Sequence, residues 1–327
     1  MQPRNKVCVI GAGYWGKNHI RTLFEMGALG GIVDNNEETQ SDFKIKYSSI
    51  SVFHRVSDAL ITGDFAGYVV ATPAETHYEI AMEIINAGCH VLVEKPVTLN
   101  IEEARNLKEA AEAQNVNLMA GHVLLFHPAI QKIKEMLDLD IIGNLQYIYS
   151  NRLNLGAVRT EENVFWSLAP HDIAIFQYFM ESIPLKITST GGAFLQKGIH
   201  DTTLTVLEYK GNIKGHIYVS WLHPFKEHRL IVIGSKGMIS FEDSTKNKPL
   251  ILYSKSYEMS GGIPEKKDGP VELIPYGNEM PLTEELKYFI QHLDGSPLNI
   301  ANGQNAVDVV DILVQASQDL TQGVSVE

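Results

Sequence analysis

Two short strings, VCVIGAGYWG at residues 7–16 and VLVEKP at residues 91–96, constrain the fold of this chain more than any other feature. In the first, an apolar strand runs into Gly11, Gly13 and Gly16. This spacing lets a backbone turn tightly, approach a pyrophosphate and open a helix against a sheet. GxGxxG is a weak signal by itself, but here an apolar strand precedes it and a helical pattern follows it. The string therefore predicts a dinucleotide-binding βαβ unit.

An aspartate at the expected distance strengthens this prediction. Asp34 ends a second strand, GGIVD, 18 residues after Gly16. A carboxylate there accepts hydrogen bonds from both ribose hydroxyls of an adenosine and repels a 2′-phosphate. Asn35 and Asn36 follow, with no Arg or Lys to bind that phosphate. The sequence predicts NAD rather than NADP, and a glycine turn in an unrelated βαβ unit is the alternative.

The second string places Lys95 at the end of an apolar strand, between Glu94 and Pro96. The carboxyl ends of strands in an open parallel sheet face the ligand crevice, so a cation there points toward chemistry. Pro96 fixes its own φ and favours an extended Lys95, which holds the direction of the side chain. The alternative is a strand-ending turn with a solvated ion pair.

Composition limits the class of protein. A length of 327 residues with 44% hydrophobic content is enough for a substantial core and indicates two domains. A formal net charge of −12 argues against a nucleic-acid partner. Cys8 and Cys89 give no disulfide framework and indicate a reducing compartment. The sequence has neither an apolar run of about 18 residues nor a signal-peptide core, so we expect a soluble, cytoplasmic protein with no membrane partner.

Strand and helix patterns alternate as far as residue 121, which is typical of a doubly wound parallel sheet. Beyond it, longer alternating segments predict a large, mainly antiparallel open sheet in an α+β domain. We therefore expect an NAD-binding Rossmann domain at 1–121 and a substrate-binding and oligomerisation domain at 122–327, with the closing helix packing back on the first. The predicted strands are 5–10, 29–34, 67–71, 90–94, 117–121, 144–155, 184–194, 202–209, 213–221 and 228–241, the last with a turn at GSKG.

The glycine string, Asp34, ATPAETH at 71–77, EKP at 94–96 and PHD at 170–172 together resemble the Gfo/Idh/MocA oxidoreductase family. Their order and spacing run through most of the chain. The resemblance implies NAD(P)-dependent oxidation or reduction of a sugar or cyclitol carbon, without a metal. It implies cofactor contacts from Gly11, Gly13, Tyr14, Trp15, Gly16, Asp34, Asn35, Thr72, Pro73, His77, Glu94, Lys95 and His122.

The reaction needs a base that takes a hydroxyl proton while hydride leaves the same carbon. His171 matches the active-site histidine of the family, and we expect it at the start of a helix after Pro170. Lys95 would bind the reacting oxygen or relay the proton, so the base is one of these two residues. Many family members have an acidic residue four positions earlier, where this chain has Ser167, and Asp172 is then a candidate to orient the imidazole.

A second departure lies in GHVLLFHP at 121–128, where many relatives have an arginine before the aromatic residue and this chain has Leu125. His122 is a candidate for the nicotinamide end of the site. We expect His127 to be a helix-start residue ahead of Pro128.

The substrate is indicated by SNRLNLGAVRTEENVFWSLAPHD, which resembles the branch of the family that oxidises nucleotide sugars, such as UDP-N-acetylglucosamine 3-dehydrogenases. Arg152 and Arg159 lie close in sequence, and two guanidinium groups together can bind a diphosphate. Surface arginines paired with Glu161 and Glu162 are an equal alternative. The expected substrate contacts are Lys95, Arg152, Asn154, Arg159, Trp166, His171 and Asp172.

Other functions stay open at this point. A free-sugar or inositol dehydrogenase shares every cofactor motif, a regulator of the same fold binds NAD(P) without turnover, and one branch of the family hydrolyses glycosides through transient oxidation. A long open sheet needs its second face covered. The resemblance implies that this happens between subunits, in a homodimer or homotetramer.

Overall fold

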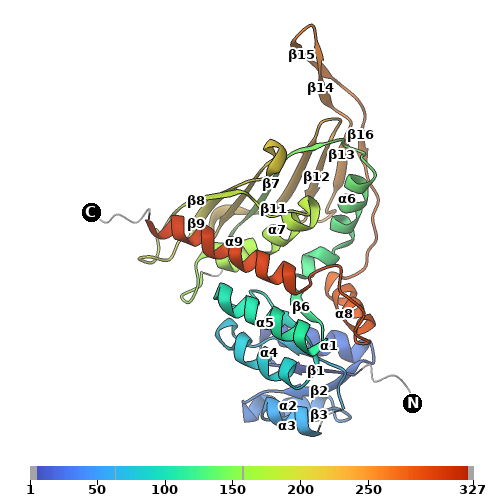
Figure 1. Cartoon of the computed structure of the whole chain (residues 1–327), viewed down its shortest axis with the longest axis vertical. Coiled ribbons are helices and arrows are strands. Elements are labelled where there is room, and N and C mark those ends of the chain that lie inside the picture. Colours follow the sequence, from blue (N-terminus) through green and yellow to red (C-terminus); the bar gives the residue numbers. More distant parts are fainter. Residues whose placement is uncertain (1–5, 63, 157, 323–327) are drawn as a thin grey trace. The chain divides into compact units, whose positions relative to one another are not determined.

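The chain forms two compact units (Figure 1). The structure, a computed structural model, describes residues 6–62, 64–156 and 158–322. Unit 1 comprises the chain up to Phe126 together with Met280–Val310, and unit 2 comprises His127–Glu279 together with the chain from Asp311 onward. The boundary expected after residue 121 lies close to Phe126. Residues 280–310, however, group with unit 1 rather than with the second domain.

Unit 1 is built on a six-stranded parallel sheet of the Rossmann type, with strand order β3-β2-β1-β4-β5-β6. Strands β1 and β4 are buried throughout, as expected for parallel strands covered on both faces. The short β3 was not predicted, because it is partly exposed and lacks an apolar run. The strands are β1 (Val7–Ile10), β2 (Leu29–Val33), β3 (Ser51–Phe53), β4 (Gly67–Val70), β5 (His90–Glu94) and β6 (Leu118–Gly121).

Helices cover both faces of this sheet. The helices are α1 (Tyr14–Glu25), α2 (Glu37–Lys46), α3 (Val56–Thr62), α4 (His77–Asn86), α5 (Ile101–Gln114) and α8 (Pro281–Gln291), with short 3₁₀ turns η1 (Ala74–Thr76) and η2 (Val123–Phe126). Helices α3, α4 and α5 pack on one face, and α1 and α8 pack on the other. Gly67 allows α8 to approach, since a Cβ there would lie 3.0 Å from the Phe289 ring.

The edge of β6 is paired by the segment that precedes the last helix. The backbone N–H of Ala120 donates to the Ala301 carbonyl at 2.7 Å, and Met119 forms an antiparallel bridge with Asn302. An unpaired edge strand exposes backbone donors and acceptors, and this segment covers them. This pairing, with the packing of α8, explains why Met280–Val310 belongs to unit 1.

Unit 2 contains an eight-stranded sheet with the order β16-β13-β12-β11-β7-β10-β9-β8. It is mixed: β7 and β10 are parallel, and the other neighbours are antiparallel. The predicted mainly antiparallel sheet is confirmed. The strands are β7 (Leu145–Leu155), β8 (Lys186–Gly192), β9 (Thr202–Glu208), β10 (Lys214–Ser220), β11 (Leu222–Gly234), β12 (Met238–Glu242), β13 (Leu250–Tyr253) and β16 (Val271–Leu273), with a separate hairpin of β14 (Ser256–Ser260) and β15 (Ile263–Lys267).

The helices of unit 2 pack on one face of its sheet. They are α6 (Pro128–Asp138), α7 (Val164–Met180) and the later part of α9 (Gly303–Gln322), and a 3₁₀ turn, η3 (Lys210–Asn212), joins β9 to β10. Gly215 on β10 lets α7 lie close, because a Cβ there would be 3.0 Å from the Phe176 ring. No helix in the part of the chain that the structure describes combines the length and the apolar character needed to cross a bilayer.

Candidate active site

The glycine turn after β1 has the geometry of an anion-binding site. Gly11 has φ +88°, and a Cβ at Gly16 would lie 1.8 Å from the Gly11 carbonyl oxygen, so both positions require glycine. A Cβ at Gly13, in contrast, would meet no atom within 4 Å. Helix α1 begins at Tyr14 without a side-chain cap or an acidic residue in its first turn. Open space beside unsatisfied helix N–H groups fits a pyrophosphate.

Asp34 is held beside this turn at the end of β2. Its Oδ2 accepts from the Ala12 N–H at 2.8 Å, and its Oδ1 accepts from the Asn36 N–H at 2.9 Å. The carboxylate is therefore fixed where an adenosine ribose is recognised in this fold. Asn36 caps α2 through the Thr39 N–H, and Asn35 is exposed.

The turn after β4 is tied to the turn after β5. Thr72 contacts the glycine turn, since its Cγ2 lies 2.8 Å from the Cβ position of Gly11. His77 is buried, with its Nε2 2.9 Å from the Thr72 carbonyl oxygen and its Nδ1 2.9 Å from that of Pro96. Both ring nitrogens thus face the backbone, so His77 positions the two turns. Its contact with the cofactor stays a prediction, as do those of Tyr14, Trp15 and Pro73.

Glu94 is the centre of a buried polar cluster at the end of β5. Its Oε1 lies 2.7 Å from the His19 Nε2, and its Oε2 accepts from the Lys95 N–H at 3.1 Å. Burial alone would raise the pKa of Glu94, but the hydrogen bond to His19 and the charges of His19 and Lys95 lower it below its usual value. Gly121 on β6 makes room, because a Cβ there would be 3.1 Å from Oε2. The half-buried Lys95 follows a fixed carboxylate and precedes a cis peptide bond to Pro96.

His122 lies next to this cluster, directly after β6. It is 1% exposed, and neither ring nitrogen has a hydrogen-bond partner among the described residues. Burial, aided by the charge of Lys95 and opposed by that of Glu94, lowers the pKa of His122 to about 4. The ring is therefore neutral at pH 7, with one nitrogen able to donate and one to accept.

In unit 2, His171 lies inside a helix rather than at its start. Helix α7 begins at Val164, where the Asn163 Oδ1 accepts from the Phe165 and Trp166 N–H groups at 3.0 and 3.1 Å. The expectation that the helix starts after Pro170 is wrong. The Asn163 cap starts the helix earlier, and Pro170 lies within it.

Because α7 begins at Val164, Ser167 lies in the same helix as His171. Ser167 is buried and lies one helical turn before His171, so both residues are on the same face of α7. The position that is often acidic in the family therefore remains next to the histidine in space, with a hydroxyl in place of a carboxylate.

Arg152 and Asp172, expected as separate substrate contacts, bind each other. The Arg152 Nε and Nη2 each donate to a different Asp172 oxygen at 2.9 Å, and the two side chains are 12% and 3% exposed. Burial would lower the pKa of Arg152, but the charge and hydrogen bonds of Asp172 raise it. Both carboxylate oxygens are engaged by this fork, so Asp172 anchors α7 to β7.

The other expected substrate residues differ in their surroundings. The Asn154 Oδ1 is buried and has no partner in the described part of the chain. Arg159 is exposed, and its carbonyl accepts from the Gln196 side chain at 2.8 Å. The Trp166 Nε1 donates to the Ser317 Oγ on α9 at 2.9 Å, which gives this ring a structural contact. Substrate contacts by all three stay predictions.

Two buried residues of unit 1 were missed by the sequence reasoning. His19 on α1 pairs with Glu94, and Glu285 on α8 is 0% exposed beside apolar neighbours. A signal for Glu285 was present. The apolar spacing that places Leu286 and Phe289 on one face of α8 includes position 285.

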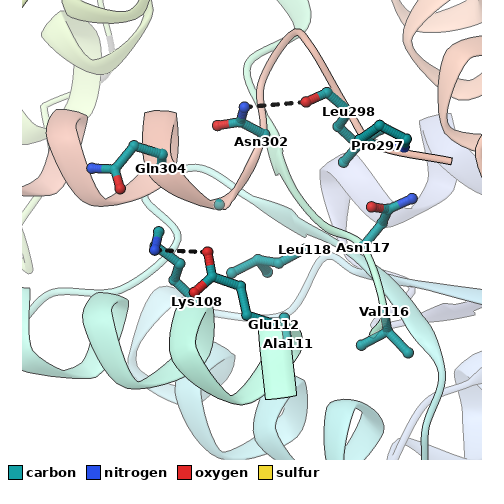
Figure 2. Close-up of a pocket in the computed structure, with 11 residues that line it drawn as sticks. Lys108, Ala111, Glu112, Val116, Asn117, Leu118, Pro297, Leu298, Asn302 and Gln304 are labelled. Atoms are coloured by element: carbon teal, nitrogen blue, oxygen red, sulfur yellow. Dashed lines mark hydrogen bonds and ion pairs between the residues drawn. The ribbon is translucent and has the colours of Figure 1, made fainter. Parts of the chain in front are cut away.

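A pocket of about 250 Å³ lies elsewhere in unit 1 (Figure 2). It opens at the amino end of β6, near Leu118, whereas Gly11, Asp34 and Lys95 follow the carboxyl ends of their strands. An ion pair between Lys108 and Glu112 lies on its wall. The pocket is therefore not part of the dinucleotide site. Within residues 6–62, 64–156 and 158–322 no group of three His, Cys, Asp or Glu side chains is arranged to hold a metal.

Both units match known protein families. Residues 5–122 match the family model described as an oxidoreductase family with an NAD-binding Rossmann fold, and residues 130–240 match the model of the GFO/IDH/MocA C-terminal domain. An uncharacterized oxidoreductase of Streptococcus pneumoniae is 25% identical over 93% of both chains. The UDP-N-acetylglucosamine 3-dehydrogenase of Acidithiobacillus ferrooxidans is 26% identical, covering 81% of this chain and 82% of the relative.

A crystal structure shows the same fold. The structure of UDP-N-acetylglucosamine 3-dehydrogenase GnnA from A. ferrooxidans superposes with a TM-score of 0.86 at 22% identity, covering 98% of this chain and 99% of the other. Two family models thus match successive parts of the chain. The fixed Asp34 and the glycine turn fit the NAD that the first family binds. This chain belongs to the Gfo/Idh/MocA family of oxidoreductases, with an N-terminal NAD(P)-binding Rossmann domain.

Proposed function

We propose that this chain is an NAD-dependent dehydrogenase that oxidises a hydroxyl of a nucleotide sugar to a ketone, at C3 of a UDP-N-acetylhexosamine or its uronate, for polysaccharide or lipid A assembly. The observation that carries the proposal is the fixed Asp34 carboxylate beside a glycine turn with open space at Gly13, within a family of oxidoreductases. The substrate rests on the likeness to UDP-N-acetylglucosamine 3-dehydrogenase.

The choice of NAD follows from charge. Asp34 accepts two backbone N–H bonds that fix the carboxylate, and Asn35 and Asn36 add no cation. A 2′-phosphate would meet the negative charge of Asp34, and Asn35 and Asn36 offer it no guanidinium or ammonium. The neutral ribose hydroxyls, in contrast, are donors for the same oxygens.

Lys95 and His171 carry the proton chemistry in this proposal. NAD, when bound, accepts the hydride. Lys95 follows the buried Glu94 at the carboxyl end of β5, and its ammonium donates to the reacting oxygen. His171 lies on α7, one turn after Ser167, and takes the hydroxyl proton. In the alternative assignment Lys95, with its amine neutral, takes the hydroxyl proton instead of His171.

The diphosphate would be bound by Arg159. Arg152 is committed to Asp172 by two hydrogen bonds, so its charge is already balanced. Arg159 is exposed. Asn154, with a buried unpartnered oxygen, is the candidate to accept from a sugar hydroxyl.

The Arg152–Asp172 pair also favours a second candidate, a free-sugar or inositol dehydrogenase. That reaction needs the same cofactor residues and no diphosphate site. A non-catalytic NAD(P)-binding regulator is the candidate from another class, and it would bind NAD without turnover.

The test is NADH formation by absorbance with NAD and a panel of UDP-sugars, free sugars and inositols, with 2-oxoglutarate as a hydride acceptor in parallel. The proposal expects turnover on a UDP-N-acetylhexosamine or its uronate, lost in Lys95→Ala. Turnover only on free sugars or inositols would contradict the nucleotide-sugar assignment. NAD binding by calorimetry with no turnover on the whole panel would favour the regulator.

A homo-oligomer is part of the proposal. On the face of the unit 2 sheet opposite the helices, Ile231, Tyr149 and His216 are direct neighbours across three strands. The Tyr149 and His216 rings stack with centroids 4.9 Å apart. Leu273 on the edge strand is 71% exposed. A second copy of the chain would cover this apolar face.

A further inference from the structure

Unit 1 contains a buried carboxyl group that the proposed reaction does not use. Glu285 on α8 is 0% exposed, and neither of its carboxyl oxygens has a hydrogen-bond partner among the described residues. Its helix neighbours Leu286 and Phe289 are also 0% exposed. A charge at this position would be stabilised neither by water nor by a hydrogen bond, which makes the ionised form costly.

The charged group that acts on Glu285 lies at the end of β5. Glu94 on β5 acts on it electrostatically as a like charge. Glu94 itself contacts His19 on α1 and accepts from the Lys95 N–H. The charges of Glu94 and Lys95 also act on the pKa of the neutral His122, which follows β6. Glu94 therefore has partners for its negative charge, whereas Glu285 has no hydrogen-bond partner in the described part of the chain.

We propose that Glu285 is a neutral carboxylic acid and a positioning residue of the nicotinamide end of the site, which holds one proton so that the Glu94–Glu285 pair carries one negative charge beside Lys95. Of two carboxyl groups that repel each other electrostatically, the one that is buried without a hydrogen-bond partner keeps its proton. Burial first, and the charge of Glu94 second, raise the pKa of Glu285 well above its ordinary value. The contacts of Glu94 lower its pKa, so Glu94 is the ionised member of the pair and Glu285 the protonated one.

The consequence concerns the charge of Lys95, and this step rests on the proposed function. A second negative charge would hold the Lys95 ammonium more firmly in its protonated form. With Glu285 neutral, the Glu94–Glu285 pair adds one negative charge rather than two near Lys95, which can then exchange a proton more easily. The protonation of Glu285 itself does not depend on the reaction or its substrate.

Infrared spectroscopy of the full chain at neutral pH tests the proposal directly, because only a protonated carboxyl group gives the carbonyl stretch of a carboxylic acid. We expect this band in the wild type and its loss in Glu285→Gln. Glu284→Gln is the matched control, since Glu284 is the preceding residue and is paired with Lys287 at 2.6 Å. A band that survives in Glu285→Gln, or a wild type without the band, would overturn the proposal.

The coupling to Glu94 is tested by titrating the same band. In Glu94→Gln the neighbouring charge is gone, so the band should disappear at a lower pH than in the wild type. An unchanged titration would overturn the assignment of Glu94 as the charge that acts on Glu285. Neither measurement requires turnover, so a failure to find a substrate leaves this result intact.

Unfolding provides a measurement that is independent of spectroscopy. The folded state keeps a proton on Glu285 that the unfolded chain releases above the ordinary glutamate pKa, so unfolding becomes more favourable as pH rises. Between pH 5 and the pKa of the buried group, the unfolding constant of the wild type should rise about tenfold per pH unit relative to Glu285→Gln. Parallel pH profiles of the two proteins in urea would overturn the proposal.

Discussion

Arg152 on β7 and Asp172 on α7 form a two-pronged ion pair inside unit 2, with both N–O distances at 2.9 Å. Asp172 is the residue after His171, so the pair fixes the turn of α7 that carries the histidine. The guanidinium fork matches the carboxylate in geometry as well as charge. We therefore infer that Arg152 helps to orient His171 through Asp172, and its contact with a substrate phosphate stays a prediction.

Replacing Arg152 with Met should destabilise unit 2 strongly. The substitution leaves Asp172, 2% exposed, as a buried charge without its partner, which costs about 3–5 kcal/mol. Urea unfolding monitored by a probe in unit 2 measures the loss. The double variant R152M/D172L should regain part of the stability, because it removes both charges.

The matched control for that experiment is Lys236→Met. Lys236 pairs with Asp140 in the same unit, but both side chains are 62% exposed, and such pairs contribute about 0–1 kcal/mol. Similar losses in R152M and K236M would contradict the importance of the buried pair.

Asp34 should determine the cofactor preference. We expect tighter binding of NADH than of NADPH by the wild type. Asp34→Ser removes a charged acceptor of hydrogen bonds, so NADH affinity should fall by about 2 kcal/mol, or roughly thirtyfold in Kd. Calorimetric titration of both nucleotides measures this change. Equal affinities for NADH and NADPH in the wild type would refute the preference for NAD.

The predictable part of this molecule is the part whose signals are local. The glycine spacing at residues 11–16 predicted the tight turn after β1, where Gly11 has φ +88°. The fully apolar strands β1 and β4 were also found, because burial on both faces leaves a continuous apolar run. Strands β14, β15 and β16 were missed, since they are almost wholly exposed and carry no apolar run.

The pairing of site residues was not predictable, because it depends on packing between distant elements. Arg152 and Asp172 were each identified as polar residues of the site, but no local pattern reveals that a strand residue and a helix residue bind each other. The same holds for His19 and Glu94, which are separated by 75 positions and lie 2.7 Å apart. From the charges in the sequence alone, Arg152 was as well suited to bind a substrate phosphate as to pair with a carboxylate of the protein.

Lys95→Ala should abolish turnover while leaving NADH binding measurable. Loss of a group that binds the reacting oxygen or moves its proton lowers kcat by about 10²–10⁴. The fold should survive, because Lys95 is half-buried at the end of a strand. Lys108→Ala, on the wall of the remote pocket, is the control and should retain full activity.

His171→Ala separates the two candidate bases. If His171 is the base, its variant should lose turnover to a similar extent and lose the acidic limb of the pH profile, while Lys95→Ala keeps that limb in its residual activity. If the limb persists in His171→Ala, Lys95 is the base.

Acid should destabilise unit 1 through His122. Burial keeps this ring neutral in the folded protein, with a pKa of about 4, whereas the unfolded chain takes up a proton near the ordinary histidine pKa. Because the unfolded state binds more protons, stability falls as pH drops from about 6.5 to 4, by on the order of 3 kcal/mol in total. His122→Asn has no imidazole to titrate, so its free energy of unfolding relative to that of the wild type should rise as the pH drops through the same range. Urea unfolding at several pH values measures the difference, and parallel curves would contradict it.

The open face of the unit 2 sheet should control assembly. Ile231→Glu places a charge beside the Tyr149 ring, which stacks on His216, where burial against a second copy would leave it unpaired. We expect light scattering to report an oligomer for the wild type and a monomer for the variant, with unchanged circular dichroism. Ile45→Glu is the matched control, because Ile45 is 81% exposed on α2 in unit 1 and lies outside this face. A wild type that is monomeric at micromolar concentration, or an Ile231→Glu variant with unchanged mass, would show that the face is not the interface between subunits.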